Sequence, residues 1–380
     1  MRRRNGGPTL GSVLKALRGS WSLLSGTLSV DALRQAWQAW AATHCMVSSH
    51  IRALIPVVGL LAAVSACATD GPAPAPQAAE RKPAVWMIPP PWPDGRCLRE
   101  LFDQPDGWKD TRSKITGIGF WATHLDEFFS DKDLRAWFAD IREWKLKLGL
   151  EVRVIKQDVP VGMDYFRRLS KQMDRFKSLG ADVYSIGMDE PCYCGKAVLS
   201  TPDDYAVQQT ADVIEAFRKR FPGVRVGDLE PYPALPLADL KTWITRLEAE
   251  LAKRGVRGLD FFRADVDWGA MNILLAGSWN EMKNLEGFCH SKGMDFSMIY
   301  WAADYPRLVD RGMVNDMTWY CGIMYQGGAY ATAGGSPDEY VIESWIQVPK
   351  RTTPETSPVT FTGSVRDFVS TFVHPPSGTK

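Results

Sequence analysis

Short apolar runs alternate with helical patterns along the chain from residue 85 onward. The runs are rich in β-branched and aromatic residues, and the stretches between them carry apolar residues at spacings of three and four, which is typical of amphipathic helices. Glycine or proline ends several helical patterns, at Gly149, Gly180 and Pro222. The predicted strands are residues 84–90, 115–122, 150–157, 182–191, 224–231, 259–268, 295–304 and 340–349.

This alternation predicts one α/β domain over residues 85–374, a single (β/α)8 TIM barrel. A doubly wound open sheet is the rival architecture, and its dinucleotide-binding form needs a glycine-rich turn between the first strand and helix. The spacing G-x-G-x-x-A occurs at residues 117–122, but it lies inside a predicted strand. We therefore do not interpret it as a phosphate-binding turn.

The N-terminal part has the pattern of an export signal. Residues 46–67 contain a short apolar run, Ala53–Ala66, followed by a cysteine. This ending resembles the bacterial lipoprotein box, and the resemblance implies that Cys67 becomes the lipidated first residue of the mature protein. Residues 1–45 are then a mis-called extension, and the Pro- and Ala-rich residues 68–84 form a tether.

We therefore expect an exported lipoprotein that is anchored in a membrane through Cys67 and faces the periplasm or the cell surface. An ordinary cleaved signal, or a chance apolar segment in a cytosolic chain, is the alternative. The formal net charge of +1 argues against nucleic acid as a partner, because nucleic-acid binding normally needs a basic excess. We expect a monomer without a cofactor.

The predicted barrel contains five cysteines: Cys97, Cys192, Cys194, Cys289 and Cys321. An oxidising compartment favours disulfides, but an odd number leaves at least one thiol free or paired elsewhere. The pair Cys192 and Cys194 beside Cys289 does not have the spacing of common zinc motifs, so we expect no metal site there.

Acidic and aromatic residues gather where the predicted strands end. Catalytic groups of (β/α)8 barrels lie at the C-terminal ends of the strands, so these residues would surround one opening. The chain also has 15 tryptophans, whose flat faces could fill a core or stack on sugar rings. The strand-end candidates are Trp121, His124, Asp189, Glu190, Asp228, Glu230, Asp265, Asp267, Trp268, Trp301, Asp304, Glu343 and Trp345.

Side-chain alternation along a strand indicates which of these acids share a face. Arg263, Asp265 and Asp267 share one face, which we expect to point into the barrel because arginine is an unfavourable neighbour for the surrounding helices. Asp228 and Glu230 also share a face. We expect Glu230 to approach Glu190 across neighbouring strand ends, because adjacent strands lie about 5 Å apart.

Two carboxylates across a glycosidic bond are what sugar hydrolysis requires: one stays protonated to release the leaving oxygen, and the other stays ionised. The run "MDEP", residues 188–191, resembles the Asn-Glu-Pro motif of the clan A-like group of barrel glycoside hydrolases. The resemblance implies that Glu190 is the acid/base. Asp189 stands where that group has asparagine, and Asp304 where its nucleophilic glutamate ends strand seven. If the first strand is miscounted, Glu230 and Glu343 become the pair.

We therefore expect a glycosidase acting on an extracellular or cell-envelope polysaccharide, with Glu190 and Glu230 catalytic and Asp267 or Glu343 in reserve. The other strand-end candidates would bind the carbohydrate. A metal-dependent hydrolase using Asp228, Glu230, Asp265 and Asp267 is one alternative. A non-catalytic carbohydrate-binding lipoprotein is the other.

Overall fold

A computed structural model describes residues 82–375 except 92–93, 274–275 and 302–313. The predicted extension, the signal with Cys67, and nearly all of the tether lie outside the described residues, as does Asp304. In the part of the chain that the structure describes, no helix is long and apolar enough to cross a membrane.

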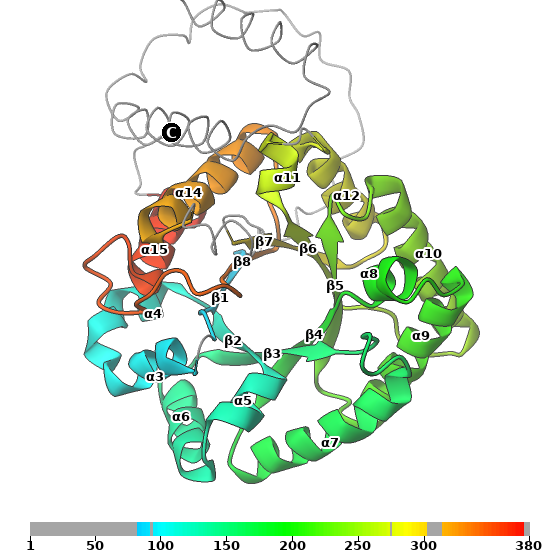
Figure 1. Cartoon of the computed structure of the whole chain (residues 1–380), viewed down its shortest axis with the longest axis horizontal. Helices are drawn as coiled ribbons and strands as arrows, with labels where there is room; N and C mark the ends of the chain where they lie inside the picture. The colour runs from blue at the N-terminus through cyan, green and yellow to red at the C-terminus, as the bar shows by residue number, and fades with distance from the viewer. Residues whose placement is uncertain (1–81, 92–93, 274–275, 302–313, 376–380) are drawn as a thin grey trace, which may run out of the picture. The chain divides into compact units, whose positions relative to one another are not determined.

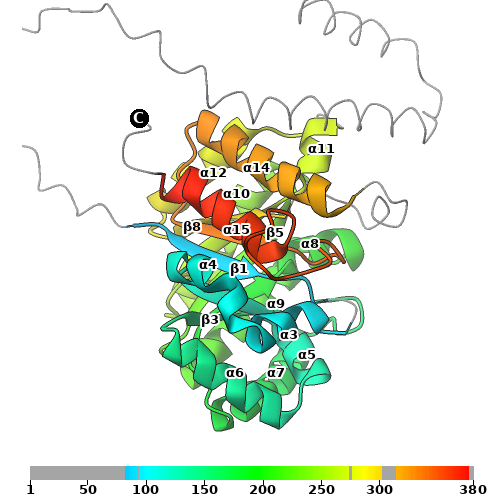
Figure 2. The same ribbon diagram turned by 90° about the vertical axis from the view of Figure 1, so that its left-hand side faces the viewer.

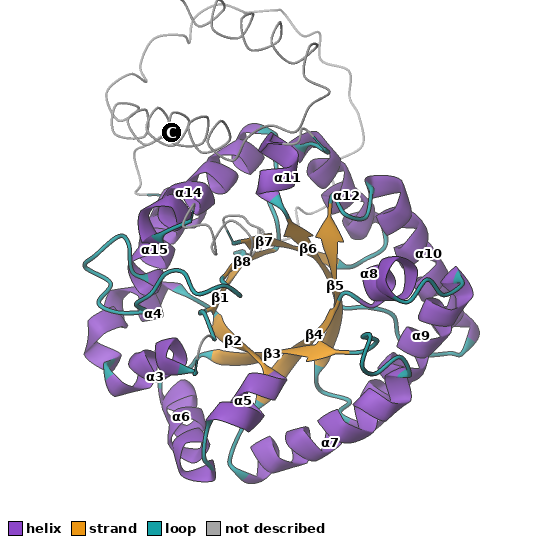
Figure 3. Cartoon of the chain, in the orientation of Figure 1, coloured by secondary structure: helices purple, strands orange, loops and turns teal. Residues whose placement is uncertain are grey.

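Eight parallel strands follow one another in order around a closed barrel (Figures 1 and 3). This confirms the (β/α)8 prediction and excludes the open sheet. The first strand pairs with both the second and the eighth, which closes the ring. The strands are β1 (Ala84–Ile88), β2 (Gly117–Trp121), β3 (Lys147–Arg153), β4 (Val183–Asp189), β5 (Arg225–Tyr232), β6 (Phe261–Val266), β7 (Asp295–Tyr300) and β8 (Glu339–Glu343).

Helices surround the barrel on its outer side (Figures 1 and 2). Their inward apolar stripes and the outer faces of the strands together form the main hydrophobic core. The α-helices are α3 (Arg96–Asp103), α4 (Lys109–Lys114), α5 (Ala122–Phe128), α6 (Asp131–Glu143), α7 (Gly162–Ser178), α8 (Pro191–Tyr193), α9 (Asp203–Arg220), α10 (Leu237–Lys253), α11 (Trp268–Ile273), α12 (Trp279–Ser291), α14 (Asp316–Thr332) and α15 (Phe361–Phe368). Three shorter helical turns are η2 (Pro105–Trp108), η3 (Cys194–Val198) and η4 (Val369–Val373).

Polar side chains mark where several helices begin. Ser130 accepts a hydrogen bond from the Asp133 amide at the start of α6, and Asn315 caps α14 in the same way. Thr360 accepts a hydrogen bond from the Gly363 amide and begins α15. Each cap satisfies amides that the first helical turn leaves without a partner inside the helix.

The inside of the barrel holds a second, smaller cluster of Trp86, Ile88, Leu229, Ile299, Trp301 and Val341. Glycines on the neighbouring strands make room for the large side chains. A Cβ atom at Gly117 would lie 2.4 Å from the Trp86 ring, and one at Gly227 would lie 2.1 Å from the Phe261 ring. Both contacts are closer than real side chains allow. The rings of Trp86 and Phe261 therefore pack directly against the backbone of β2 and β5.

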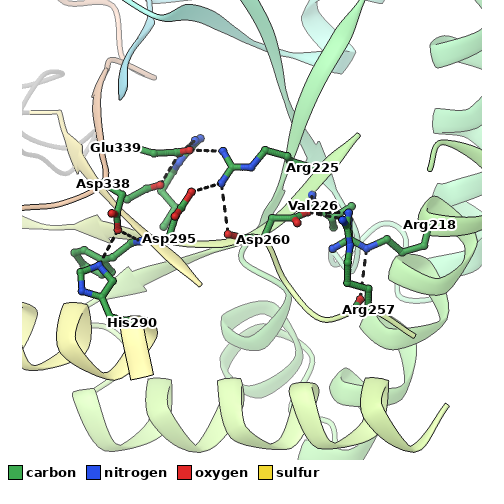
Figure 4. Close-up of polar contacts among 12 residues, drawn as sticks. Arg218, Arg225, Val226, Arg257, Asp260, His290, Asp295, Asp338 and Glu339 are labelled. Atoms are coloured by element: carbon green, nitrogen blue, oxygen red, sulfur yellow. Dashed lines mark hydrogen bonds and ion pairs between the residues drawn. The ribbon is translucent and has the colours of Figure 1, made fainter. Parts of the chain in front are cut away.

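A network of ion pairs lies at the N-terminal end of the barrel, opposite the ends where sites form (Figure 4). Arg225, the first residue of β5, contacts Glu339 at 2.6 Å and Asp295 at 2.5 Å. Glu339 also accepts a hydrogen bond from the Ser297 hydroxyl at 2.7 Å. Because these residues begin β5, β7 and β8, the network holds the N-terminal ends of three strands together.

Candidate active site

Five carboxylates from four strand ends influence one another at the C-terminal end of the barrel. Strand pairing places Glu151 opposite Trp121, and Asp189 opposite Arg153, near the ends of their strands. Besides burial, the charges of neighbouring members of this group raise the pKa values of Glu151, Asp265 and Glu343. The group, called here the mouth acids, consists of Glu151, Asp189, Glu190, Asp265 and Glu343.

Two adjacent mouth acids share one lysine. The Lys156 ammonium lies 2.8 Å from Asp189 Oδ2 and 3.5 Å from Glu190 Oε2, and all three side chains are only partly exposed. Burial alone would lower the pKa of Lys156, but Asp189 and Glu190 raise it above its usual value, so the ammonium stays charged. Asp189 therefore forms the shorter of the two ion pairs with this lysine.

The Glu190 carboxyl has a raised pKa. Burial raises the pKa of Glu190 to about 7, the neighbouring Asp189 adds to the rise, and Lys156 opposes it. A carboxyl group with this pKa carries its proton in a large share of molecules near neutral pH. Glu190 can therefore act as a carboxylic acid at the end of this strand.

The backbone of Glu190 has a left-handed conformation, with φ 53° and ψ 43°. This region is uncommon for a residue with a side chain and costs about 1–2 kcal/mol. Its amide donates to Leu229 O at 2.8 Å, and its carbonyl accepts from the Cys194 amide at 2.9 Å. The turn redirects the chain from β4 into α8, so Glu190 stands at the point where the strand direction changes.

The other mouth acids are more deeply enclosed. Burial raises the pKa of Glu151 well above its usual range, with Glu343 and Asp189 adding to the rise. Burial raises the pKa of Asp265 in the same way, with Glu190 and Glu343 adding to it. Burial raises the pKa of Glu343 to about 7, while Arg263 and the Trp121 indole oppose the rise. These acids are thus neutral or partly neutral near pH 7.

Several buried polar atoms around the mouth acids have no hydrogen-bond partner among the described residues. Two are acceptors, Glu151 Oε2 and Asp265 Oδ1, and two are donors, the Trp301 indole nitrogen and Arg263 Nε. Leaving such groups unpaired costs about 1–3 kcal/mol each. A ligand with hydroxyl groups, which both donate and accept, would satisfy both kinds of atom. A small pocket leads beneath them, lined by Trp86, Ile88, Gly119, Gly149, Leu150, Glu151, Ser185, Gly187 and Arg263.

Aromatic rings form one side of the opening. The Trp301 and Trp345 rings lie 5.0 Å apart between centroids at an angle of 43°. Trp301 belongs to the interior cluster, and the half-buried Trp345 packs against it. His124 packs between Trp121 and Phe128, and burial lowers the pKa of this histidine to about 4. The imidazole is therefore neutral at ordinary pH.

The structure places Asp228 and Glu230 on the opposite side of the sheet from the mouth acids. The inner face of β5 carries Gly227 and Leu229, so the two acids face the helices and are fully buried. Asp228 accepts a hydrogen bond from the Trp243 indole at 2.6 Å. The prediction that both acids share a face agrees with this arrangement, but the prediction that this face opens into the site does not.

Glu230 has both carboxylate oxygens occupied by backbone amides, with Cys192 N at 2.6 Å and Tyr193 N at 3.0 Å. Burial raises the pKa of Glu230 above its usual range, and these two N–H groups oppose the rise. A carboxylate held in this way has no free oxygen for a substrate. We therefore do not retain Glu230 as the catalytic partner of Glu190.

Two further candidates contribute to local structure. Asp267 accepts a hydrogen bond from the Ala270 amide at 2.8 Å and begins α11. Trp268, the first residue of that helix, is buried with its ring 6.1 Å from that of Tyr325. Arg263 and Asp265 belong to the inner face, as alternation predicted, because Arg263 lines the interior pocket and Asp265 interacts with the mouth acids.

The strand count also decides between two interpretations of the Glu-Pro motif. "MDEP" ends β4, because Ala84–Ile88 is the first strand, and the alternative based on a miscounted strand no longer applies. β7 ends at Tyr300, followed by Trp301, so no glutamate stands at that strand end. The chain thus has the Glu-Pro motif of the resemblance at the end of β4, but no glutamate at the end of β7.

Sequence reasoning missed Glu151 and Lys156. The third strand was expected to begin at residue 150, which put Glu151 at its start, whereas β3 begins at Lys147 and brings Glu151 near its end. A glutamate between Leu150 and Val152 could have indicated a functional residue, because burying a charged side chain within an apolar strand costs free energy unless it is paired. Lys156 follows β3 in a loop and carries no such signal.

In the part of the chain that the structure describes, no three His, Cys, Asp or Glu side chains are arranged to hold a metal ion. The metal-dependent alternative also required Asp228 and Glu230 to join Asp265, and the sheet separates them. Four of the barrel cysteines, Cys97, Cys192, Cys194 and Cys289, are buried free thiols.

Comparison with known proteins shows no family for this chain. No family model and no curated protein matches the chain. Among solved structures, a xylanase from Cellvibrio japonicus in complex with xylopentaose aligns with 10% identity and a TM-score of 0.47, over 78% of this chain and 68% of the xylanase. The carboxyl transferase domain of Rhizobium etli pyruvate carboxylase aligns with 14% identity and a TM-score of 0.43, over 78% of this chain and 45% of that chain. An aldolase, QR15, aligns with 12% identity and a TM-score of 0.37, over 68% of this chain and 88% of that chain. This chain therefore spans less than half of the transferase, and likenesses at this level carry no conclusion about the activity of this chain.

Proposed function

We propose that the chain is a glycoside hydrolase in which Glu190 is the general acid and Asp189 is the ion-paired carboxylate beside it. One observation carries the proposal: Lys156 contacts Asp189 at 2.8 Å and Glu190 at 3.5 Å, and burial raises the pKa of this Glu190 carboxyl to about 7. A carboxyl group with a pKa raised in this way can donate a proton near neutral pH.

The proposed reaction assigns one role to each of these two carboxyl groups. Cleavage of a glycosidic bond places a proton on the leaving oxygen and develops positive charge at the anomeric carbon. Glu190 donates that proton, so the leaving group departs as an alcohol, and Asp189 stabilises the positive charge. A water molecule then adds its oxygen to the anomeric carbon and returns a proton to the Glu190 carboxylate, which restores the acid. The ion pair with Lys156 fixes the position of Asp189 before the substrate arrives.

The remaining mouth acids suit the recognition of sugar hydroxyls. Glu151 and Asp265 each present a buried oxygen without a protein partner, and the Trp301 indole presents a donor. The half-buried ring of Trp345, which packs on Trp301, offers apolar area to a sugar ring. With the predicted lipid anchor on Cys67, the substrate would be a polysaccharide of the cell envelope or its surroundings.

The charge of the site favours a neutral sugar. The cations nearest the mouth acids are already paired, Lys156 with Asp189 and Arg263 with Glu339. Among the described residues, a sugar carboxylate would enter a group of acids whose nearest lysine, Lys156, is already paired with Asp189. We expect glucuronides to be hydrolysed with a kcat/KM at least about 10-fold below that of the matching glucosides or galactosides, since 1.4 kcal/mol of repulsion gives that factor. Equal or faster hydrolysis of the glucuronide in paired aryl glycosides would contradict this expectation.

The proposed function itself is tested by exposing the purified barrel to a panel of bacterial and plant polysaccharides and measuring new reducing ends. We expect release from at least one polysaccharide by the natural chain and a loss of release in Glu190→Gln. Binding of a polysaccharide without any release would instead support the non-catalytic alternative.

Lys156 should set the pH range of the reaction. Lys156 lowers the pKa of Glu190, so removing the ammonium raises this pKa above about 7. A general acid works while it is protonated, and activity is lost as the pH rises through its pKa. We therefore expect Lys156→Met to move the alkaline limb of the kcat/KM profile to higher pH, together with a lower maximum.

The matched control is Lys196→Met, because Lys196 also pairs with an aspartate, at 2.6 Å from Asp239, but on the surface. Its pH profile should match that of the natural chain. An unmoved or acid-shifted limb in Lys156→Met would show that Glu190 does not govern this limb.

A further inference from the structure

The loop that carries Glu190 is fixed from the neighbouring strand β5. The Glu190 amide donates to Leu229 O at 2.8 Å. One residue further along β5, the two oxygens of Glu230 accept the amides of Cys192 and Tyr193 at 2.6 and 3.0 Å. These amides open the short helix α8, which lies beside β5 (Figure 1). β5 therefore binds the chain both at Glu190 and directly after it.

The Glu230 contacts replace a cap that the local sequence lacks. Amides in the first turn of a helix need an acceptor from elsewhere, and Glu190, the residue at the cap position, gives no side-chain hydrogen bond to them. Its side chain is turned to Lys156 instead. The acceptor comes from Glu230, which is 0% exposed and lies on the outer face of its strand.

We propose that Glu230 is a positioning residue for the proton donor: by binding the Cys192 and Tyr193 amides, it holds Glu190 in its left-handed backbone conformation. Without this acceptor, the two amides would be buried and unpaired, and Glu190 could relax toward the more common conformations that turn its carboxyl away from the mouth. The inference rests on the proposed function of Glu190 and gives the buried acid on β5 a role in it.

Position matters to this reaction because proton transfer requires the acid within about 2.6–3.2 Å of the leaving oxygen. A displacement of about 1 Å can cost about 100-fold in rate. The cost should fall on substrates that need the proton. Aryl glycosides with strongly acidic leaving groups need little protonation, so a misplaced acid should affect them much less.

The experiment compares Glu230→Gln, Asp228→Asn and Glu190→Gln on aryl glycosides whose leaving groups span a wide range of acidity. Glutamine keeps one acceptor but turns an N–H group toward the second amide. We expect Glu230→Gln to lose about 10- to 100-fold in kcat on poor leaving groups and little on good ones, following the trend of Glu190→Gln. Glu230→Asp, which retains two acceptor oxygens, should recover part of the loss.

Asp228→Asn is the matched control, because Asp228 lies on the same face of β5 and is equally buried but bonds to Trp243 in α10. It should lower the thermal midpoint without changing the leaving-group trend. A Glu230→Gln variant that loses rate equally on all leaving groups would overturn the positioning role. If Glu190→Gln itself shows no leaving-group trend, the proposed function fails instead.

A crystal structure of Glu230→Gln tests the backbone directly and does not depend on finding a substrate. We expect the φ angle of Glu190 to leave its value near 53° or the loop over residues 190–194 to become disordered. An unchanged Glu190 conformation in the folded variant would contradict the inference.

Discussion

Glu190→Gln is expected to lower kcat on natural oligosaccharides by about 100- to 10,000-fold, the range associated with loss of a general acid. Glutamine keeps the size and hydrogen-bonding ability of the side chain but has no proton to donate to the leaving oxygen. Binding should persist, because the hydroxyl-binding atoms of Glu151, Asp265 and Trp301 are untouched. Steady-state kinetics and calorimetric titration with the same oligosaccharide separate the two effects.

The control is Glu127→Gln, which changes an exposed glutamate on α5, the helix that follows β2. It should keep the activity of the natural chain. Full activity of Glu190→Gln on an unactivated glycoside would show that another group protonates the leaving oxygen.

Arg225→Met is expected to lower the free energy of unfolding by about 3–5 kcal/mol, because it leaves a buried carboxylate without its main partner. Glu339 has only 3% of its side chain exposed, and Arg225 is its closest cation at 2.6 Å. Arg263, at 3.5 Å, and the Ser297 hydroxyl would remain as partners of Glu339. Urea denaturation followed by circular dichroism measures the change.

Arg246→Met provides the comparison, since Arg246 pairs with two aspartates, Asp203 and Asp204, that are mostly exposed. Its loss should stay within about 1 kcal/mol. Equal and small losses in both variants would mean that the network at the N-terminal end of the barrel contributes little. The folded Arg225→Met protein should remain active, because this network lies at the far end of the strands from the mouth.

The barrel could be predicted from the sequence because each strand is a short apolar run between two helical patterns. All eight predicted strand segments overlap the observed strands. Alternation along β6 also predicted that Arg263 and Asp265 face inward. These features depend on local periodicity, which the sequence carries directly.

The orientation of β5 could not be predicted in the same way. Alternation shows that Asp228 and Glu230 share a face, but both faces of a barrel strand can be buried, so polarity does not identify the inner one. Here the inner face holds Gly227 and Leu229. On the outer face, Asp228 accepts a hydrogen bond from the Trp243 indole, and Glu230 accepts hydrogen bonds from amides of α8. Those partners come from other segments and are invisible to a strand pattern.

The site was predicted in part because acids at strand ends are visible in the sequence, whereas their charge states are not. Lys156, which contacts both adjacent acids, follows β3, whereas Asp189 ends β4 and Glu190 comes directly after it. Only the fold brings Lys156 to Asp189 and Glu190 and buries Glu190. The raised pKa of Glu190 therefore arises from tertiary structure.

The most direct test of the account is a crystal structure of Glu190→Gln with an oligosaccharide that the natural chain cleaves. We predict that the glycosidic oxygen lies within about 2.6–3.2 Å of the side-chain amide at position 190, with Asp189 facing the anomeric carbon of the same bond. An oligosaccharide whose scissile bond lies beyond the reach of both side chains would contradict the assignment of Glu190 and Asp189 as the catalytic pair.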